Sequence, residues 1–578
     1  MKKRRLFLFL ICAMLMITGV SGSINQASAE IQSTIRVYLR RLQITDTISL
    51  TTHGEYMTSD GKTVFSDGTK MTIVLRHGQL VLHSGGIVSV MGDKMQLIRC
   101  QNDDDERQGI TIAGNDGLYE GDLSLDINND VIRPILSIHV EDYLLGVVPF
   151  EMGDSFPLEA LKAQAITART YALRKSGASG AYDVEDTTND QAYRGRTTNS
   201  PLSEQAVKET EGMCGVYRGS LAQCFYSASN GGQTELGQHV WPTSDPDAYG
   251  YMDMRDDPYD FENKKSIVKR YSISKKPGAD GVGTALHHAL VSAMADQLAD
   301  MDVEADPELI RFDEIQNIEA ITPKYDGDSR LMTELRFTVK ISTRAYTFRQ
   351  TSNPEPSQTP SPSDAPETAE PTATPAFSAY TKVKEPVTVI LPIFTEAEQA
   401  MGLSINVSQN ELITVYDIGS EFMIESRRFG HGVGMSQRGA EQMANQYGMT
   451  YEQILAFYYP GMGLVTYDMI RSPLPTIDTE LMTTPAPTPS PTPRPTLMPV
   501  TEKDLPKDAY VAQVANIDED STLNLRKEPN MSADVIRRLY KDQKLVVLDI
   551  DKNGWAHVKT DVVEGYVRSE YIQTDKES

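Results

Sequence analysis

The chain has 578 residues and a formal net charge of −25. That length predicts two or three globular units joined by linkers, because single domains rarely grow so large. An excess of carboxylates repels phosphate backbones, so nucleic acid is excluded as the main partner, and an exported soluble protein is favoured.

The first 29 residues have the pattern of a secretory signal. A basic cluster, Lys2–Arg5, precedes an apolar stretch from Leu6 to Val20 and a small-residue site at Ala27–Ala29. The apolar core is short for a membrane-spanning helix. We expect a secreted, cell-wall protein; the alternative is a protein anchored to the membrane by an uncleaved segment.

Short strands dominate the first part of the chain, since segments rich in β-branched residues alternate with Gly, Asp and Asn. A later segment has helical character, and another alternates like a half-buried strand. The predicted strands are 72–75, 79–82, 132–140 and 335–341, and the predicted helix is 285–301. The sequence therefore predicts a strand-rich α+β body.

Glu151 stands between an apolar strand and a helix of small residues, 158–171. A carboxyl group among apolar neighbours resists ionisation, so its pKa rises and it can donate a proton near neutral pH. A solvated loop glutamate is the commoner alternative. We expect Ser155 to cap the helix and Pro157 to lie in its first turn.

Two cations of this helix, Lys162 and Arg169, lie seven residues apart, beside its apolar stripe. They could face a binding groove. Side chains that extend their charged ends to solvent are the commoner alternative.

A glycine-rich segment, 429–440, places alternate glycines around His431. Glycine lets the backbone approach a ligand or a neighbour closely, and a histidine can donate hydrogen bonds. The spacing is not that of a dinucleotide-binding loop. A glycine-rich turn with a structural histidine remains the alternative. The polar segments 190–195 and 225–235 suit an uncharged ligand such as a glycan, or simple turns.

Of four cysteines, Cys12 lies in the signal segment. Cys214 and Cys224 are close enough in sequence to pair, but three mature cysteines is an odd count, so either one stays free or all do. No CxxC or HExxH spacing occurs, so neither a metal site nor a cofactor is predicted.

Several of these motifs, in this order, resemble the SpoIID/LytB family over about residues 35–467. The motifs are Glu141–Leu144, Gly146–Pro149, Glu151–Met152, Glu159–Ala165, Ala168–Tyr171, Gln191–Gly195, Gly231–Glu235 and Gly430–Ala440.

The resemblance implies a lytic transglycosylase acting on peptidoglycan glycan strands, with Glu151 as the catalytic acid. The candidate substrate-binding residues are Lys162, Arg169, Gln191, Tyr193, Tyr226, Gly232, Thr234, His431, Gly432, Ser436 and Gln437. Sporulation-linked wall remodelling is one setting for such an enzyme.

The chain departs from the family pattern at several positions. Some relatives hold zinc with His and Cys where this chain has Asn189–Asp190 and Ser227–Asn230, so we infer no zinc. Phe457 replaces a usual histidine, and Arg438 replaces a usual aromatic residue.

One glutamate can be enough for this chemistry, because the sugar's own hydroxyl replaces the second carboxylate that hydrolytic glycosidases need. Glu141 is a possible second acid, although the resemblance implies a structural role for it. Two other functions remain open: a non-catalytic peptidoglycan-binding modifier that stimulates a partner amidase, and an adhesion or scaffold protein.

Two Pro/Thr/Ser-rich segments divide the chain, because their composition favours extended backbone. The first, 353–377, interrupts the body, 31–472; the second, 473–506, is a linker before a tail module, 507–574. Regular short strands in the tail resemble a bacterial SH3-like β-barrel. Trp555 and Tyr566 either bind the wall or form the barrel core.

Overall fold

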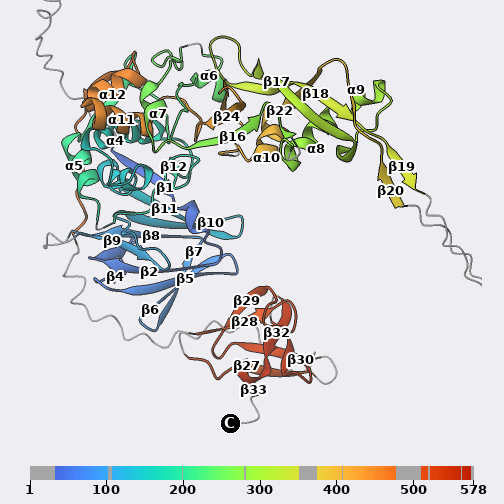
Figure 1. The fold of residues 1–578 in the computed structure, drawn as a ribbon. Helices are drawn as coiled ribbons and strands as arrows, with labels where there is room; N and C mark the ends of the chain where they lie inside the picture. The colour runs from blue at the N-terminus through green and yellow to red at the C-terminus, as the bar shows by residue number, and fades with distance from the viewer. Residues whose placement is uncertain are drawn as a thin grey trace, which may run out of the picture. The chain divides into compact units, whose positions relative to one another are not determined.

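The computed structural model describes residues 33–101, 107–197, 199–245, 247–278, 281–349, 374–406, 408–476, 505, 509–518, 521–560 and 563–574. The predicted signal segment and most of both Pro-rich segments lie outside these residues. The chain forms two compact units, residues 1–477 and 478–578. The strand-rich α+β fold is confirmed (Figure 1).

The first unit begins with two sheets, ordered β12-β1-β11-β10-β8-β3-β4 and β7-β6-β5-β2-β9. Their strands are β1 (Thr34–Tyr38), β2 (Thr47–His53), β3 (Tyr56–Thr58), β4 (Val64–Phe65), β5 (Lys70–Arg76), β6 (Gln79–Ser84), β7 (Ile87–Gly92), β8 (Lys94–Arg99), β9 (Gly109–Ile112), β10 (Asp122–Asn128), β11 (Val131–His139) and β12 (Val184–Glu185). The first three strand predictions are confirmed by β5, β6 and β11. Buried and half-buried residues alternate along β1 and β2, and buried residues of both sheets belong to one hydrophobic core.

Helices and short strands cover this core. They are α2 (Val140–Leu144), α3 (Val148–Glu151), α4 (Leu158–Lys175), α5 (Pro201–Glu209), α6 (Gly237–Val240), α7 (Pro258–Glu262), α11 (Gln437–Tyr447), α12 (Tyr451–Tyr458), β13 (Met213–Tyr217), β14 (Ser220–Leu221), β15 (Tyr226–Ser227), β25 (Met435–Ser436) and β26 (Gly463–Thr466). Segments 433–459 belong to the same core as the first sheets, so the body is built from two separated parts of the chain.

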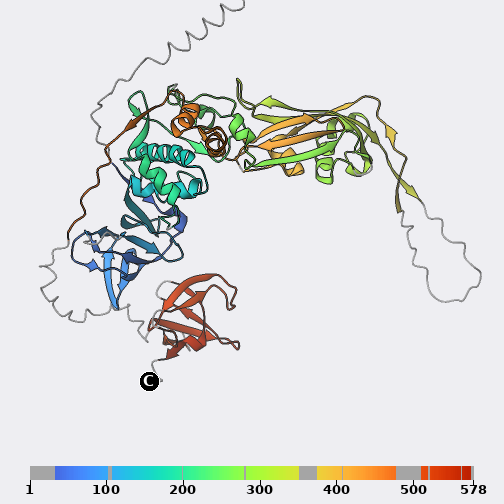
Figure 2. The ribbon, with the colours of Figure 1, turned by 60° about the vertical axis from the view of Figure 1, so that its left-hand side comes forward.

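Helix α4 is the central helix of the body. It contacts α2, α5, α11 and α12 (Figures 1 and 2). Five buried alanines allow these close approaches: Ala160, Ala163, Ala165, Ala168 and Ala172.

The prediction that Ser155 caps helix α4 is wrong. The N-cap residue is Pro157, with extended backbone and no side-chain cap, and Ser155 is exposed two residues earlier. The neighbouring Asp154 instead accepts hydrogen bonds from the first turn of α5, at 3.3 Å from Leu202 N and 2.7 Å from Ser203 N.

Between α7 and β25 the chain forms a lobe with its own hydrophobic core, within residues 268–427. Its elements are β16 (Val268–Ser274), α8 (Thr284–Ala293), α9 (Ala295–Asp300), β17 (Ile310–Pro323), β18 (Met332–Thr343), β19 (Tyr346–Arg349), β20 (Thr374–Phe377), β21 (Thr381–Lys382), β22 (Val387–Pro392), α10 (Glu398–Met401), β23 (Leu412–Asp417) and β24 (Glu421–Arg427). The interruption of the body is therefore larger than the Pro-rich segment.

Within the lobe, the alternating segment 335–341 lies in β18, as predicted. The single helix predicted at 285–301 is wrong, because it breaks at Met294 between α8 and α9, where the backbone leaves helical geometry (φ −91°, ψ 2°).

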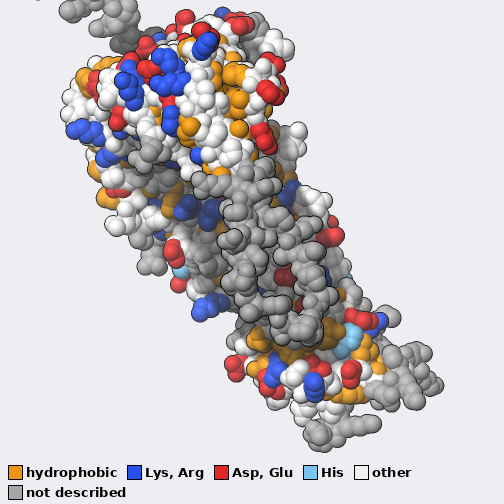
Figure 3. All heavy atoms as spheres, turned by 45° about the vertical axis from the view of Figure 1, so that its right-hand side comes forward, with side chains coloured by type: hydrophobic (Ala, Val, Ile, Leu, Met, Phe, Trp, Pro, Cys, Tyr) orange, Lys and Arg blue, Asp and Glu red, His pale blue; other side chains and the backbone are white. Residues whose placement is uncertain are grey.

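On the face shown in Figure 3 acidic and basic side chains are interspersed, so the excess negative charge forms no single patch there.

The second unit is a small barrel ordered β29-β28-β32-β31-β30-β27-β33. Its strands are β27 (Tyr510–Val514), β28 (Thr522–Arg526), β29 (Val535–Tyr540), β30 (Lys544–Ile550), β31 (Trp555–Lys559), β32 (Glu564–Arg568) and β33 (Ile572–Thr574). Inward-facing apolar residues from six of these strands form its core.

Two further findings concern the described residues alone. Cys100, Cys214 and Cys224 are all buried and free. No helix in the described ranges is both long and apolar enough to cross a bilayer.

Candidate active site

Glu151 is the last residue of the short helix α3 and is half-buried. Its Oε1 accepts a hydrogen bond from the backbone N–H of Ala192 at 2.7 Å. Burial raises the pKa of the Glu151 carboxyl, and this effect exceeds the opposing effect of the bonds from Ala192, Tyr226 and Gln437. Within the described ranges Glu151 has no ion pair. It is a solitary acid that keeps its proton to a higher pH than an ordinary glutamate.

A chain of neutral groups holds the Tyr226 hydroxyl beside this carboxyl. The amide of Gln191 donates to the Tyr226 oxygen at 3.1 Å, and its Oε1 accepts from Tyr143 at 3.1 Å. With its oxygen occupied in this way, the Tyr226 O–H is free to donate to Glu151. Gln191 is buried and therefore acts as a support for Tyr226.

Gln437 reaches the same carboxyl from the start of helix α11. The strand just before it, β25, pairs in parallel with β15, so that Tyr226 lies opposite Met435. The Gln437 amide also contacts the side-chain oxygen of Gln164 at 3.4 Å. Gln164, which the sequence did not single out, is fully buried, and its amide nitrogen has no hydrogen-bond partner in the described structure.

The glycine-rich segment packs closely against Phe225. A Cβ at Gly434 would lie 2.2 Å from the Phe225 carbonyl oxygen, and both Gly430 and Gly434 have positive φ, so glycine is required for this close approach. Ser436 is buried and caps α11 by accepting from Gly439 N at 3.0 Å.

His431 is held in one tautomer by two backbone contacts. Its Nδ1 accepts from Val433 N at 3.0 Å, and its other nitrogen bonds to the backbone of Tyr226. Burial, with a smaller contribution from the charge of Arg428, lowers the pKa of His431 to about 4. His431 is neutral at pH 7 and is therefore a hydrogen-bonding and packing group, not a competing acid.

Aromatic rings that were not among the predicted binding residues pack beside His431. Phe225 and Trp241 stack with centroids 4.1 Å apart, and Trp241 meets the His431 ring edge-on at 5.0 Å. Tyr171 lies 6.4 Å from Phe225. These rings are half-buried, so part of each is available to a ligand. The available signal was Trp241 itself, because the sequence has only two tryptophans and this one lies outside every predicted strand.

Other predicted binding residues do not reach this carboxyl. Arg169 is fully buried, and its Nε and Nη2 donate to the two Glu141 oxygens, each at 2.7 Å. Glu141 therefore has the structural role that the resemblance implied. Lys162 pairs with Glu159 and Glu209, both at 2.8 Å.

Tyr193 is buried, stacked on Tyr143 at 5.0 Å. Thr234 is buried and bonds to the carbonyl of Asp253 at 3.0 Å. Gly232 and Gly432 act through their backbone carbonyls. Arg330 donates a hydrogen bond to the Gly232 carbonyl, and the backbone N–H of Glu235 donates one to the Gly432 carbonyl.

In the tail barrel, Trp555 is buried, whereas Tyr566 is half-buried and stacks on His557 at 4.7 Å. Among the residues the structure describes, no group of three or more His, Cys, Asp or Glu side chains is placed to hold a metal ion.

Comparison with known proteins places two domains on this chain. Residues 128–217 match the stage II sporulation protein family, and residues 521–573 match the bacterial SH3 domain. The first range includes Glu151 and Gln191 but not the glycine-rich segment.

Three relatives extend the similarity. An amidase enhancer of Bacillus subtilis is 30% identical over 329 residues, 56% of this chain and 40% of the relative. An uncharacterised protein of Brachyspira hyodysenteriae is 26% identical over 377 residues, 63% of this chain and 78% of the relative. Stage II sporulation protein D of B. subtilis is 26% identical over 169 residues, 26% of this chain and 48% of the relative. The matches to the two named relatives thus span less than half of each.

Proposed function

We propose that this chain, which contains a stage II sporulation protein domain and a bacterial SH3 domain, is a lytic transglycosylase that cleaves peptidoglycan glycan strands. The observation that carries the proposal is the setting of Glu151: a half-buried carboxyl with a raised pKa, neutral hydrogen-bond donors around it, and no charged partner in the described ranges. A hydrolase would normally need a second carboxylate.

The reaction uses Glu151 first as an acid and then as a base. The protonated carboxyl gives its proton to the glycosidic oxygen, and the bond between that oxygen and the anomeric carbon breaks with both electrons leaving on the oxygen. The primary hydroxyl of the same muramoyl sugar attacks the anomeric carbon and gives its proton to the carboxylate. The products are a free 4-hydroxyl and a 1,6-anhydro end, and Glu151 is protonated again.

Neighbouring groups favour the two halves of this cycle. Tyr226 and Gln437 donate to the Glu151 carboxylate and stabilise it after proton transfer. The attacking hydroxyl belongs to the bound sugar, so its effective concentration exceeds that of an external nucleophile. The apolar rings of Phe225 and Trp241 offer flat surfaces for sugar faces.

The proposal also covers the role of the tail barrel and the location of the protein. We assign the barrel to wall binding, with half-buried Tyr566 as the accessible aromatic group. The protein acts outside the cell, in the wall. Peptidoglycan, not nucleic acid, is its ligand.

The similarity to an amidase enhancer favours a second function, in which the same body binds peptidoglycan without cleaving it and stimulates a partner amidase. The two functions predict different products from the purified protein.

The test is digestion of glycan strands stripped of stem peptides by the full chain, with mass analysis of the products. Anhydromuramoyl ends that disappear in Glu151→Gln and persist in Glu55→Gln support the transglycosylase; Glu55 is a half-buried glutamate of the same body. Wall binding without new ends, together with faster hydrolysis by an added amidase, would assign the stimulating function instead.

A further inference from the structure

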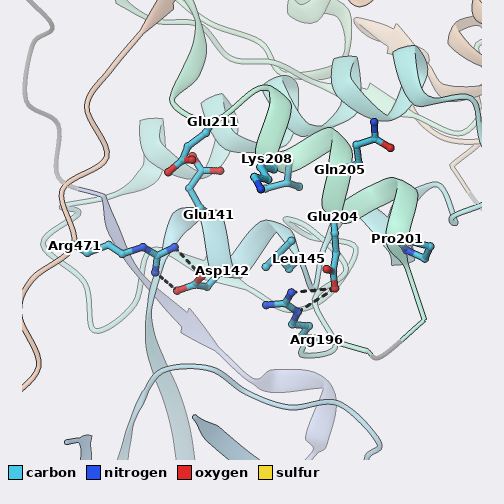
Figure 4. Close-up of a pocket in the computed structure, with 11 residues that line it drawn as sticks. Glu141, Asp142, Leu145, Arg196, Pro201, Glu204, Gln205, Lys208, Glu211 and Arg471 are labelled. Carbon is cyan, nitrogen blue, oxygen red and sulfur yellow. Dashed lines mark hydrogen bonds and ion pairs between the residues drawn. The ribbon is translucent and has the colours of Figure 1, made fainter. Parts of the chain in front are cut away.

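A cavity of about 460 Å³ opens in the body between helix α2, helix α5 and the chain that follows β26 (Figure 4). Its volume lies in the range of small-molecule sites. Glu151, Tyr226 and Gln437 are not among its lining residues, so it is distinct from the candidate active site.

The cavity combines apolar surface with fixed charges. Leu145, Pro201 and Val207 supply apolar surface. Figure 4 shows two ion pairs in the lining: Arg471 bonds to both oxygens of Asp142, at 2.5 and 2.9 Å, and Arg196 reaches Glu204 at 3.0 Å.

Two further charged side chains of the lining, Lys208 and Glu211, take part in no close ion pair within the described ranges, although the charge of Arg471 acts on Glu211. Lys208, at the end of α5, and Glu211, just after it, are exposed and form no side-chain hydrogen bond or ion pair with the described residues. A ligand can therefore offer a carboxylate to Lys208 and an ammonium group to Glu211 without breaking an existing pair. Complementary charges of this kind fix the orientation of a ligand more than they raise its affinity.

We propose that this cavity binds the stem peptide that hangs from peptidoglycan glycan strands. Such a peptide carries carboxylates, small alanine methyl groups and, before cross-linking, a free amino group. Its methyl groups would contact Leu145 and Val207, and its two kinds of charge would meet Lys208 and Glu211. The inference rests on the proposed function, since it names a second part of the same polymer.

The test titrates the full chain with a synthetic stem tetrapeptide that has a free carboxyl terminus and a free side-chain amine. Binding is followed by calorimetry and by the NMR signals of the Leu145 and Val207 methyl groups, which lie in the lining of this cavity. We expect these signals to shift, and we expect Lys208→Glu, which replaces attraction by repulsion, to weaken binding about threefold to tenfold. The matched control is Lys70→Glu, an exposed lysine on β5, which should bind like the wild type.

Three outcomes would overturn the inference: methyl signals that do not move, equal affinity in Lys208→Glu, or binding lost in Tyr566→Ala instead, which assigns the peptide to the barrel. Its failure is separable from that of the proposed function. Glu151→Gln should bind the peptide normally while making no anhydro ends, whereas a wild-type chain that binds the peptide but cleaves nothing refutes only the transglycosylase.

Discussion

The oxygen of Tyr226 accepts a hydrogen bond from Gln191 at 3.1 Å, which leaves the Tyr226 proton for the carboxyl of Glu151. A tyrosine oriented in this way stabilises the ionised acid and so limits how far burial raises its pKa. The balance between burial and hydrogen bonding sets the pH range in which Glu151 can act.

Tyr226→Phe removes one donor to the Glu151 carboxylate, so the pKa of Glu151 should rise further. A general acid works only while protonated, and cleavage by the wild type therefore falls as pH rises through this pKa. In Tyr226→Phe that fall should move to higher pH, and the maximal rate should drop on the order of tenfold to a hundredfold. A pH–rate profile measures both, and a fall at unchanged pH would contradict the hydrogen bond.

Glu151→Gln should stabilise the fold at neutral pH. Because the folded pKa of Glu151 lies above the unfolded value, the folded state holds the proton more tightly, and its stability falls as pH rises through the interval between the two pKa values. Glutamine cannot ionise, so the gain should vanish well below the ordinary glutamate pKa of about 4.3. Urea unfolding at several pH values measures the difference.

Glu209→Gln is the control, because the pKa of Glu209 is shifted in the direction opposite to that of Glu151. Hydrogen bonds from Lys162 and Gln205 lower the pKa of Glu209, so its ionised form favours folding. Glu209→Gln should not stabilise the protein at neutral pH. A gain from both substitutions would show a general effect of lost charge.

Glu141→Gln should destabilise the body strongly. The substitution leaves Arg169 buried with its charge uncompensated, and breaking one partner of a buried pair costs about 3–5 kcal/mol. Lys162→Ala breaks two more exposed pairs, with Glu159 and Glu209, and should cost only about 0–1 kcal/mol for each. Chemical unfolding compares the two, and equal small losses would contradict the structural role of Glu141.

Trp241→Ala should weaken binding of glycan strands, because it removes the ring stacked on Phe225 beside His431. The loss of aromatic contact is worth roughly 0.5–1.5 kcal/mol, up to about tenfold in affinity. Trp241→Phe keeps a flat ring and should bind nearly as the wild type does. Affinity for the strands measured in the Glu151→Gln background avoids turnover; equal affinity in all three proteins would remove Trp241 from the site.

Local sequence placed Glu151 between an apolar strand and a helix of small residues, which are β11 and α4. The two short helices between them, α2 and α3, were not predicted, and Glu151 ends α3 instead of following the strand directly. The strand alternation of the two sheets and of the tail barrel was likewise predictable from local sequence.

Contacts between distant segments were not predictable in this way. The spacing of Lys162 and Arg169 gave no sign that Arg169 is buried against Glu141, 28 positions away. Phe225, Trp241 and His431 meet only because the body closes across the inserted lobe. The sequence of 285–301 likewise gave no sign of the break at Met294, whose side chain is fully buried in the lobe core.

The central claim is that a sugar hydroxyl, not water, completes the cleavage that Glu151 begins. The most direct test is digestion of stripped glycan strands by the full chain in water enriched in oxygen-18, with mass analysis of the new ends. The account predicts anhydro ends that carry no heavy oxygen. New reducing ends labelled with oxygen-18 would contradict it, since they require hydrolysis.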